Sequence, residues 1–206
     1  MAVATVSGCE ALCRSLDEAI AGQTDEHVLT ARVEEALKTL IRERAVDLPE
    51  EYRRPAETRY ARRLVHKSPE LGYTVLAMVW GPGQGTLLHD HCGMWCVEAV
   101  YDGAIDVRQF ELMERDGDRF RFEERERIRA GIGSAGSLIP PYEYHTLTNA
   151  SREQPAITVH VYGGEMVRAC VFHEAEAPAG EAPAGEAPVG SGCWYTHEER
   201  ELSYTV

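Results

Sequence analysis

The chain has 206 residues, of which 44% are hydrophobic and 27% charged, and its formal net charge is −13. This length and composition suit one folded domain with a sizeable core, with or without extensions. So negative a surface repels polyanions, and we expect neither nucleic acid nor an anionic membrane as a partner. No apolar run reaches the ~18 residues of a membrane span, and the first residues lack the features of a secretory signal. We therefore expect a cytoplasmic protein whose six cysteines are reduced thiols.

The first 55 residues carry helical patterns. Segments 9–21 and 25–46 are expected to be helices, and Thr24 or Asp25 offers a side-chain cap for the second. Apolar residues recur there at three-to-four spacing, at Val28, Val33, Ala36, Leu37, Leu40 and Ile41. We expect residues 1–55 to form a helical extension that packs on the remainder of the chain.

From Tyr60 onward the chain has the pattern of short strands. Residues 73–80 (YTVLAMVW) are β-branched and aromatic, and residues 156–162 (AITVHVY) alternate cleanly. The Asp-Gly pairs at 102–103 and 116–117 are hairpin signals. One or two strands are expected over 87–101, and further strands at 104–110, 119–124 and 167–173. Many short strands with turns at roughly ten-residue spacing predict a mostly β sandwich or barrel.

The second expected unit, residues 56–206, contains one segment of low complexity. Residues 174–192 repeat the pattern EAPAG, EAPAG, EAPVG. Such a sequence cannot bury enough apolar surface to offset its ordering entropy, so we interpret it as a flexible loop. Whether this loop covers a functional site is left open.

Three histidines form a candidate metal site. Residues i and i+2 of a strand point to the same face, so His89 and His91 can both face the interior of a barrel. His145 is the leading candidate for a third ligand, because it follows the Pro-Pro turn at 140–141 and precedes Asn149. An isolated H-x-H is a weak signal, and three imidazoles alone do not choose among zinc, copper, nickel and iron.

The spacing around these histidines is more specific. Residues 83–103 follow the pattern G-x5-H-x-H-x4-C-x6-G, which resembles the first cupin motif with Cys96 in the place of its usual glutamate. Residues 136–149 resemble the second cupin motif through a glycine, a proline, His145 and Asn149. The resemblance implies a cupin, which is a jelly-roll β-barrel, here with N-terminal α-helices.

The cysteine at position 96 narrows the resemblance. Over residues 58–173 the chain is similar to the thiol dioxygenases, in particular the cysteine dioxygenases, which bind iron(II) through three histidines. Thr158, His160 and Tyr162 alternate on one strand and resemble the family's Ser-His-Tyr triad, with threonine for serine. The resemblance implies that His160 orients Tyr162 and Thr158 orients His160. It also raises a thioether crosslink between Cys96 and Tyr162, whose formation is left open.

The same resemblance implies a substrate site. Tyr60 and Arg62 resemble the segment that carries the family's carboxylate-binding arginine, and residues 80–89 (WGPGQGTLLH) resemble its approach to the metal. Arg168 is a candidate second anion contact, as in the members that act on mercaptopropionate. Trp95 beside the histidines also resembles that group, while Arg62 and Cys96 resemble the cysteine group.

The implied function is a non-haem iron(II) thiol dioxygenase that adds both atoms of O2 to the sulfur of cysteine or a related thiol-carboxylate and gives a sulfinic acid. Other thiols stay open as substrates, among them 3-mercaptopropionate, mercaptosuccinate and ergothioneine-like compounds. A cupin isomerase or a dioxygenase acting on carbon usually keeps the motif glutamate, so Cys96 disfavours both. An alternative of another class is a non-catalytic, metal-binding cupin that senses a small ligand. Whether the protein is a monomer or a homo-oligomer is left open.

Overall fold

The computed structural model describes residues 6–176 and 192–205, and this part of the chain is mostly β. The helices are α1 (Cys9–Ile20), α2 (Glu26–Arg42) and α3 (Glu50–Arg53). The strands are β1 (Ala61–Lys67), β2 (Thr74–Trp80), β3 (Leu88–His89), β4 (Cys96–Asp102), β5 (Ala104–Asp116), β6 (Arg119–Gly131), β7 (Ala135–Leu138), β8 (His145–Asn149), β9 (Ala156–Tyr162), β10 (Arg168–Ala175) and β11 (Cys193–Glu201). None of the described helices has the length and apolar character that crossing a bilayer requires. The loop expected at 174–192 falls mainly on residues 177–191, which lie outside the described residues, and its first two residues end β10.

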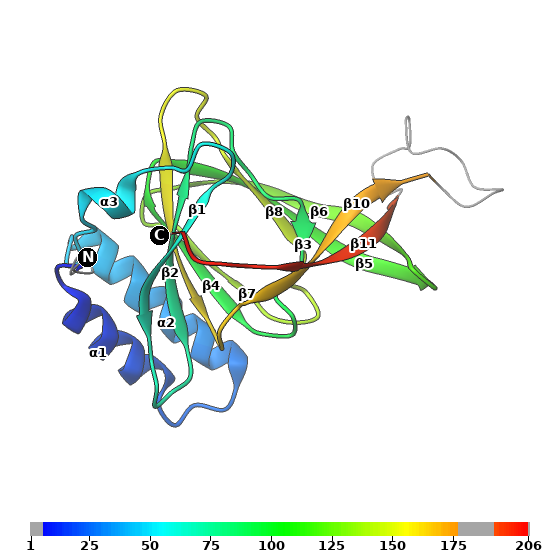
Figure 1. Ribbon diagram of the computed structural model, residues 1–206. Coiled ribbons are helices and arrows are strands. Elements are labelled where there is room, and N and C mark those ends of the chain that lie inside the picture. Colours follow the sequence, from blue (N-terminus) through cyan, green and yellow to red (C-terminus); the bar gives the residue numbers. More distant parts are fainter. Residues whose placement is uncertain (1–5, 177–191, 206) are drawn as a thin grey trace.

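The strands form two antiparallel sheets (Figure 1). One has the order β1-β2-β9-β4-β7, and the other has the order β10-β11-β6-β5-β8-β3. The second sheet closes on itself, because β3 pairs with β10 as well as with β8. The hairpin of β5 and β6 and the pair β10–β11 extend away from the helices. This mostly β barrel with helices before it is the cupin fold that the two motifs predicted.

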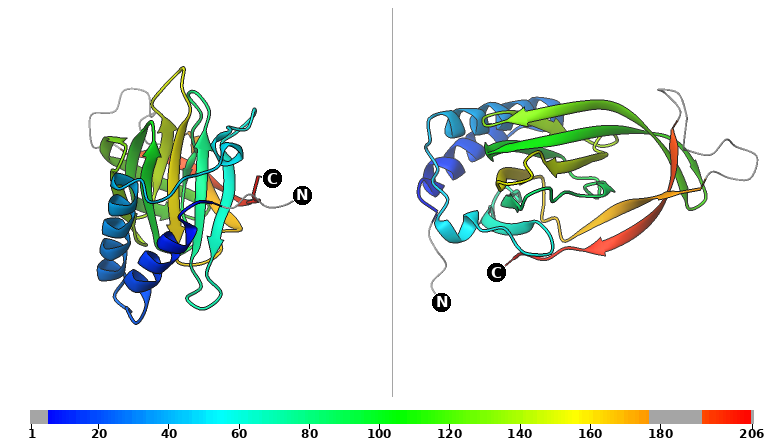
Figure 2. Two further views of the ribbon diagram at one scale, coloured as in Figure 1. Left: turned by 90° about the vertical axis from the view of Figure 1, so that its left-hand side faces the viewer. Right: turned by 90° about the horizontal axis from the view of Figure 1, so that it is seen from above.

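Strands β2 and β9 of the five-stranded sheet are buried along their whole length, and α1 and α2 cover one face of this sheet (Figure 2). Val97, Val159 and Val161 share one apolar cluster with Leu16 and Leu37 of the helices. Alternate residues of the same strands face the opposite way, into the barrel. Whether a residue of β4 or β9 has an odd or an even position along its strand (its parity) therefore decides whether its side chain contacts the helices or the barrel interior.

Helix α2 begins at Asp25, whose side chain accepts hydrogen bonds from the backbone N–H groups of His27 and Val28. Its buried residues are Leu29, Thr30, Val33, Leu37 and Leu40. Val28, which the sequence placed on this face, is 41% exposed. The apolar stripe is centred on residues 29, 33, 37 and 40, and Val28 lies one helical step to its side.

The predicted strand through His89 and His91 is shorter than expected. Strand β3 contains only Leu88 and His89, so His91 lies beyond its end. The chain then turns through Cys92 and Gly93, both with positive φ, before β4 begins. The turn, and not simple alternation along one strand, brings the second imidazole to the interior.

Candidate metal centre and adjoining cavities

The three predicted histidines converge inside the barrel. His89 of β3 lies directly opposite His145 of β8, with ring centroids 4.5 Å apart. The ring of His91 is 5.4 Å from that of His89 and 5.0 Å from that of His145. One ligand nitrogen from each ring lies within 4.8 Å of the other two, which is close enough for all three to bind one ion.

Backbone carbonyls fix the orientation of two of these rings. Nδ1 of His145 is 2.7 Å from the carbonyl oxygen of Glu143, and Nδ1 of His89 is 3.0 Å from that of Leu87. Both Nδ1 atoms can donate to these carbonyls, which leaves each Nε2 lone pair free for a ligand.

The ring of His91 is buried without a hydrogen-bond partner at either nitrogen among the described residues. The same holds for Nε2 of His145. A buried polar atom without a partner costs about 1–3 kcal/mol, and a bound cation would remove that cost. The donor set and its unpaired nitrogens therefore fit a metal ion.

The charge state of two of these imidazoles also suits a metal. Burial, together with the neighbouring His145, lowers the pKa of His89 to about 3. The same causes hold the pKa of His91 well below its ordinary value. Metal binding requires neutral imidazoles. Both rings are already neutral, so no proton has to leave before they bind a metal.

Behind the histidines, β9 carries the predicted triad of Thr158, His160 and Tyr162, which we call the relay. Oγ1 of Thr158 is 2.7 Å from Nε2 of His160, and the hydroxyl of Tyr162 is 3.2 Å from Nδ1 of His160. The indole N–H of Trp80 donates to Oγ1 of Thr158 over 2.9 Å. All four side chains are buried, and the ring of Tyr162 meets that of His91 edge-on at 5.7 Å. The relay therefore holds the phenol of Tyr162 against the histidine cluster.

Cys96 and Tyr162 are direct partners across β4 and β9. Burial raises the pKa of the Cys96 thiol well above its ordinary value, and a hydrogen bond with Tyr162 offsets part of this effect. Burial, together with Cys96 itself, also raises the pKa of Tyr162 well above its ordinary value. A neutral thiol and a neutral phenol thus lie side by side, and the thioether between them stays a prediction.

The structure adds a residue that the sequence analysis missed. Glu98 is two residues beyond Cys96 on β4, and its Oε1 lies 3.2 Å from Nε2 of His145 and 3.1 Å from Nδ1 of His160. Burial alone would raise the pKa of Glu98, but His160 and His145 hold it well below the ordinary value. Burial likewise opposes the charge on His145, whose pKa Glu98 nevertheless raises. A glutamate with the parity of Cys96, inside a buried strand, was the signal that could have found it.

A cavity of about 230 Å³ is lined by His89 and by two of the predicted substrate residues, Tyr60 and Arg62. Arg62 is only 6% exposed, and its Nη2 donates to the carbonyl of Met166 over 2.9 Å. Its Nη1 has no hydrogen-bond partner among the described residues. Tyr60 packs on Trp80 with ring centroids 4.5 Å apart, and Tyr162 completes the wall beside the histidines. The cavity thus offers a buried cation next to the candidate metal centre.

Two further predicted substrate residues do not reach this cavity. Trp95 has the parity of Val97, so its side chain packs in the core between the helices and the sheet. Arg168 is exposed on β10 and does not line the cavity. Arg59 and Arg200 lie at the cavity instead, which the sequence did not indicate.

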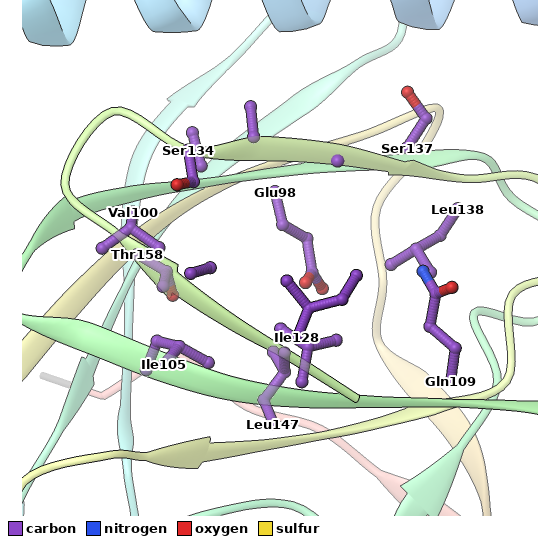
Figure 3. A pocket seen from close by; sticks show the side chains of 15 residues that line it. Glu98, Val100, Ile105, Gln109, Ile128, Ser134, Ser137, Leu138, Leu147 and Thr158 are labelled. Atoms are coloured by element: carbon purple, nitrogen blue, oxygen red, sulfur yellow. The ribbon is translucent and has the colours of Figure 1, made fainter. Parts of the chain in front are cut away.

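Glu98 lines a second cavity, which has a volume of about 120 Å³ (Figure 3). Apolar side chains from several strands form most of its wall, among them Ile105, Ile128, Leu138 and Leu147. The carboxylate of Glu98 points into this space from β4. Glu98 thus lies between the histidine cluster and an apolar space.

Comparison with known proteins gives the chain its relatives. It is 23% identical over 104 residues to cysteine dioxygenase type 1 of Rattus norvegicus, and equally to that of Mus musculus. Each match covers 50% of this chain, and the chain spans about half the length of these curated relatives.

Two solved structures share part of the fold at low similarity. One is an uncharacterized conserved protein with a double-stranded β-helix domain from Klebsiella pneumoniae, with 22% identity, a TM-score of 0.43, and coverage of 57% of this chain and 88% of that chain. The other is TT1209 from Thermus thermophilus, with 22% identity, a TM-score of 0.42, and coverage of 55% and 90%.

The family model described as cysteine dioxygenase type I matches residues 18–174, which include the helix α2, the three histidines and the relay on β9. The chain belongs to the cysteine dioxygenase type I family.

Proposed function

We propose that this protein is a non-haem iron(II) thiol dioxygenase that converts cysteine or a related small thiol-carboxylate to its sulfinic acid. One observation carries the proposal: three imidazoles converge, two of them with nitrogens that have no hydrogen-bond partner among the described residues, and the third, His89, lines a cavity together with the buried Arg62. Membership of the family supports it. Both oxygen atoms of O2 go to sulfur, which gives up four electrons as O2 takes up four, so no further reductant is needed.

His89, His91 and His145 would hold the metal. When bound, a ferrous ion supplies a cationic, redox-active centre at which a thiol is stabilised as thiolate and dioxygen can react. Three protein ligands leave positions for both.

Arg62 would bind the carboxylate of the substrate. The hydrogen bond to Met166 fixes one end of the guanidinium, and the unpaired Nη1 is left for an acceptor in the cavity. A carboxylate held there places its thiol beside the histidines. Arg59 and Arg200 on the same cavity favour mercaptosuccinate, a thiol with two carboxylates, as the second candidate substrate.

Tyr162 would donate a hydrogen bond to the substrate or to the reacting oxygen. Its raised pKa keeps the phenol protonated at neutral pH. Oγ1 of Thr158 accepts from the indole of Trp80 and can donate to Nε2 of His160, which favours the tautomer with the imidazole proton on Nδ1. His160 then donates toward Tyr162, and the phenolic proton is free to point into the cavity.

Oxygen consumption by anaerobically purified, iron(II)-loaded protein tests the proposal. The panel is cysteine, 3-mercaptopropionate, mercaptosuccinate, cysteamine and ergothioneine, and a His145→Ala variant is the control. We expect uptake with a thiol-carboxylate, a product heavier by two oxygen atoms, and no uptake by the variant. No uptake with any thiol, in protein that holds stoichiometric iron, would overturn the proposal and favour the ligand-sensing cupin.

A further inference from the structure

Cys9, Cys13 and His66 form a cluster of metal-binding side chains between helix α1 and strand β1. One ligand atom from each residue lies within 4.8 Å of the other two, and all three residues are half-buried. The two cysteines are four residues apart on α1 and therefore share one face of that helix. We propose that this cluster is a separate metal site that binds Zn²⁺. It has no residue in common with the histidine centre, so the inference goes beyond the proposed function.

The separation of the two sulfur atoms is that of two ligands on one zinc ion. Sγ of Cys9 is 3.9 Å from Sγ of Cys13. A zinc–thiolate bond is about 2.3 Å long, and two such bonds at the tetrahedral angle place their sulfurs about 3.8 Å apart. An imidazole nitrogen on the same ion lies about 3.5 Å from each sulfur, from bond lengths of about 2.0–2.3 Å. This distance is inside the 4.8 Å that bounds the cluster, so small side-chain rotations complete the site.

A β-bulge turns His66 toward the helix. Leu64 pairs with Leu76 on β2, but the next pair is His66 with Val75, so Val65 is an extra residue in β1. Leu64 packs inside the barrel and Val65 packs against the helices. Strict alternation would return His66 to the barrel side, whereas the bulge places its ring beside the thiols of α1. Bulges often re-aim a side chain next to a functional site.

The surroundings of the cluster also suit a cation. Asp17 lies one helical turn beyond Cys13, and the hydroxyl of Tyr73 donates to its Oδ1 over 2.8 Å. The ring of Tyr73 packs beside that of His66, with centroids 5.7 Å apart. Asp17 thus adds negative charge near the thiols, which a bound cation offsets. Burial raises the pKa of the Cys13 thiol to about 12, so the ion displaces a proton when it binds there.

The donor types select the ion. Two thiolates and one imidazole are the ligands that zinc prefers, with water in the fourth position, whereas Mg²⁺ and Ca²⁺ require oxygen donors. The ion would tie α1 to β1, the strand that carries Arg62. The match to the family model begins at residue 18, after both cysteines, so the site belongs to a part of the chain that the family match does not include.

Co²⁺ titration of the full chain tests the assignment. Thiolate ligands give bound Co²⁺ a charge-transfer absorption in the near ultraviolet, which imidazole ligands do not. Apo-protein prepared with a chelator and kept in a non-thiol reductant is titrated as wild type, Cys13→Ser and His66→Asn. Cys193→Ser, at a half-buried cysteine of β11, is the matched control. Circular dichroism shows first that each variant is folded.

We expect the wild type to bind one Co²⁺ with this absorption, in addition to any ion at the histidine centre. Cys13→Ser should lose the absorption and weaken this binding more than about 100-fold, beyond the 10- to 100-fold effect of changes around metal ligands. His66→Asn keeps both thiols and should weaken binding as well, while Cys193→Ser should match the wild type. Unchanged affinity and absorption in Cys13→Ser or in His66→Asn would overturn the inference.

Two further measurements separate this site from other possibilities. His145→Ala removes one ligand of the histidine centre and should keep the charge-transfer absorption, so failure of that centre is seen independently of this site. In the His145→Ala background, Zn²⁺ should raise the urea midpoint of the chain, and adding Cys13→Ser should abolish the increase. Wild-type protein that forms a Cys9–Cys13 disulfide in air and shows no charge-transfer absorption after reduction would overturn the inference and assign the two thiols to redox chemistry.

Discussion

Replacing Arg62 by methionine should remove recognition of the substrate carboxylate. The side chain is buried on β1 and lines the cavity, and its Nη1, which has no partner among the described residues, can form one charge-assisted hydrogen bond. Such a bond contributes about 1.5–3 kcal/mol, and a factor of ten corresponds to ~1.4 kcal/mol. We therefore expect kcat/KM for a thiol-carboxylate to fall about 10- to 100-fold. The rate with cysteamine, which has no carboxylate, should change little.

The adjacent arginine provides the matched control for this experiment. Arg63 pairs with Ala77 on β2 and bonds the carbonyl of Arg54, so it points away from the cavity. Oxygen uptake is measured with both substrates for Arg62→Met and Arg63→Met, after circular dichroism and iron content show that each variant is folded and loaded. Equal losses with cysteamine and with the thiol-carboxylate, or equal losses in the two variants, would refute the role assigned to Arg62.

Two predictions concern the scaffold and are checked by urea unfolding. Leu37→Ala removes a side chain that is only 1% exposed beneath the sheet and should cost about 2–5 kcal/mol of unfolding free energy. Val28→Ala, at a position 41% exposed, should cost less than about 1 kcal/mol. Equal costs would contradict the packing of this helix. Gly103→Ala should cost more than Gly117→Ala. Both glycines have positive φ, worth about 1–2 kcal/mol for another residue, but only at Gly103 would the new Cβ come within 2.9 Å of the Cβ of Ala156. A larger loss at Gly117 would contradict this ranking, since no atom of the described residues lies within 4 Å of a Cβ there.

Local spacing was sufficient to predict the centre of the site. The pattern through His89 and His91 and the later His145 identified three rings that meet in the barrel. Alternation along β9 placed Thr158, His160 and Tyr162 on one face, and the structure joins them by hydrogen bonds. The structure brings these side chains together because each expectation depends on residues close together in one strand or on a motif of fixed length, and their roles stay predictions.

The alternation of side chains along β4 explains two differences between the expected and the observed positions. Cys96 faces Tyr162 in the interior, so Trp95 must face the helices and Glu98 must face the interior. Alternation counted from Cys96 along β4 is enough to predict both positions. Sequence proximity to the histidines suggested Trp95, although neighbours on a strand point in opposite directions.

The remaining differences depend on contacts between distant parts of the chain. Arg200 reaches the cavity because β11 pairs with β10, across the segment 177–191 that no local pattern bridges. The exposure of Arg168 depends on which face of β10 lies toward the barrel interior. The pairing of β10 with β3 sets that face. Neither pairing can be read from hydrophobic periodicity.

We propose that three histidines hold an iron ion at which a small thiol receives both atoms of dioxygen. The most direct test is the mass of the product formed by iron(II)-loaded protein from a thiol-carboxylate under heavy-isotope dioxygen. We predict a sulfinate that carries two labelled oxygen atoms, formed with one O2 consumed per thiol. A disulfide, or a product that carries one label or none, would contradict it.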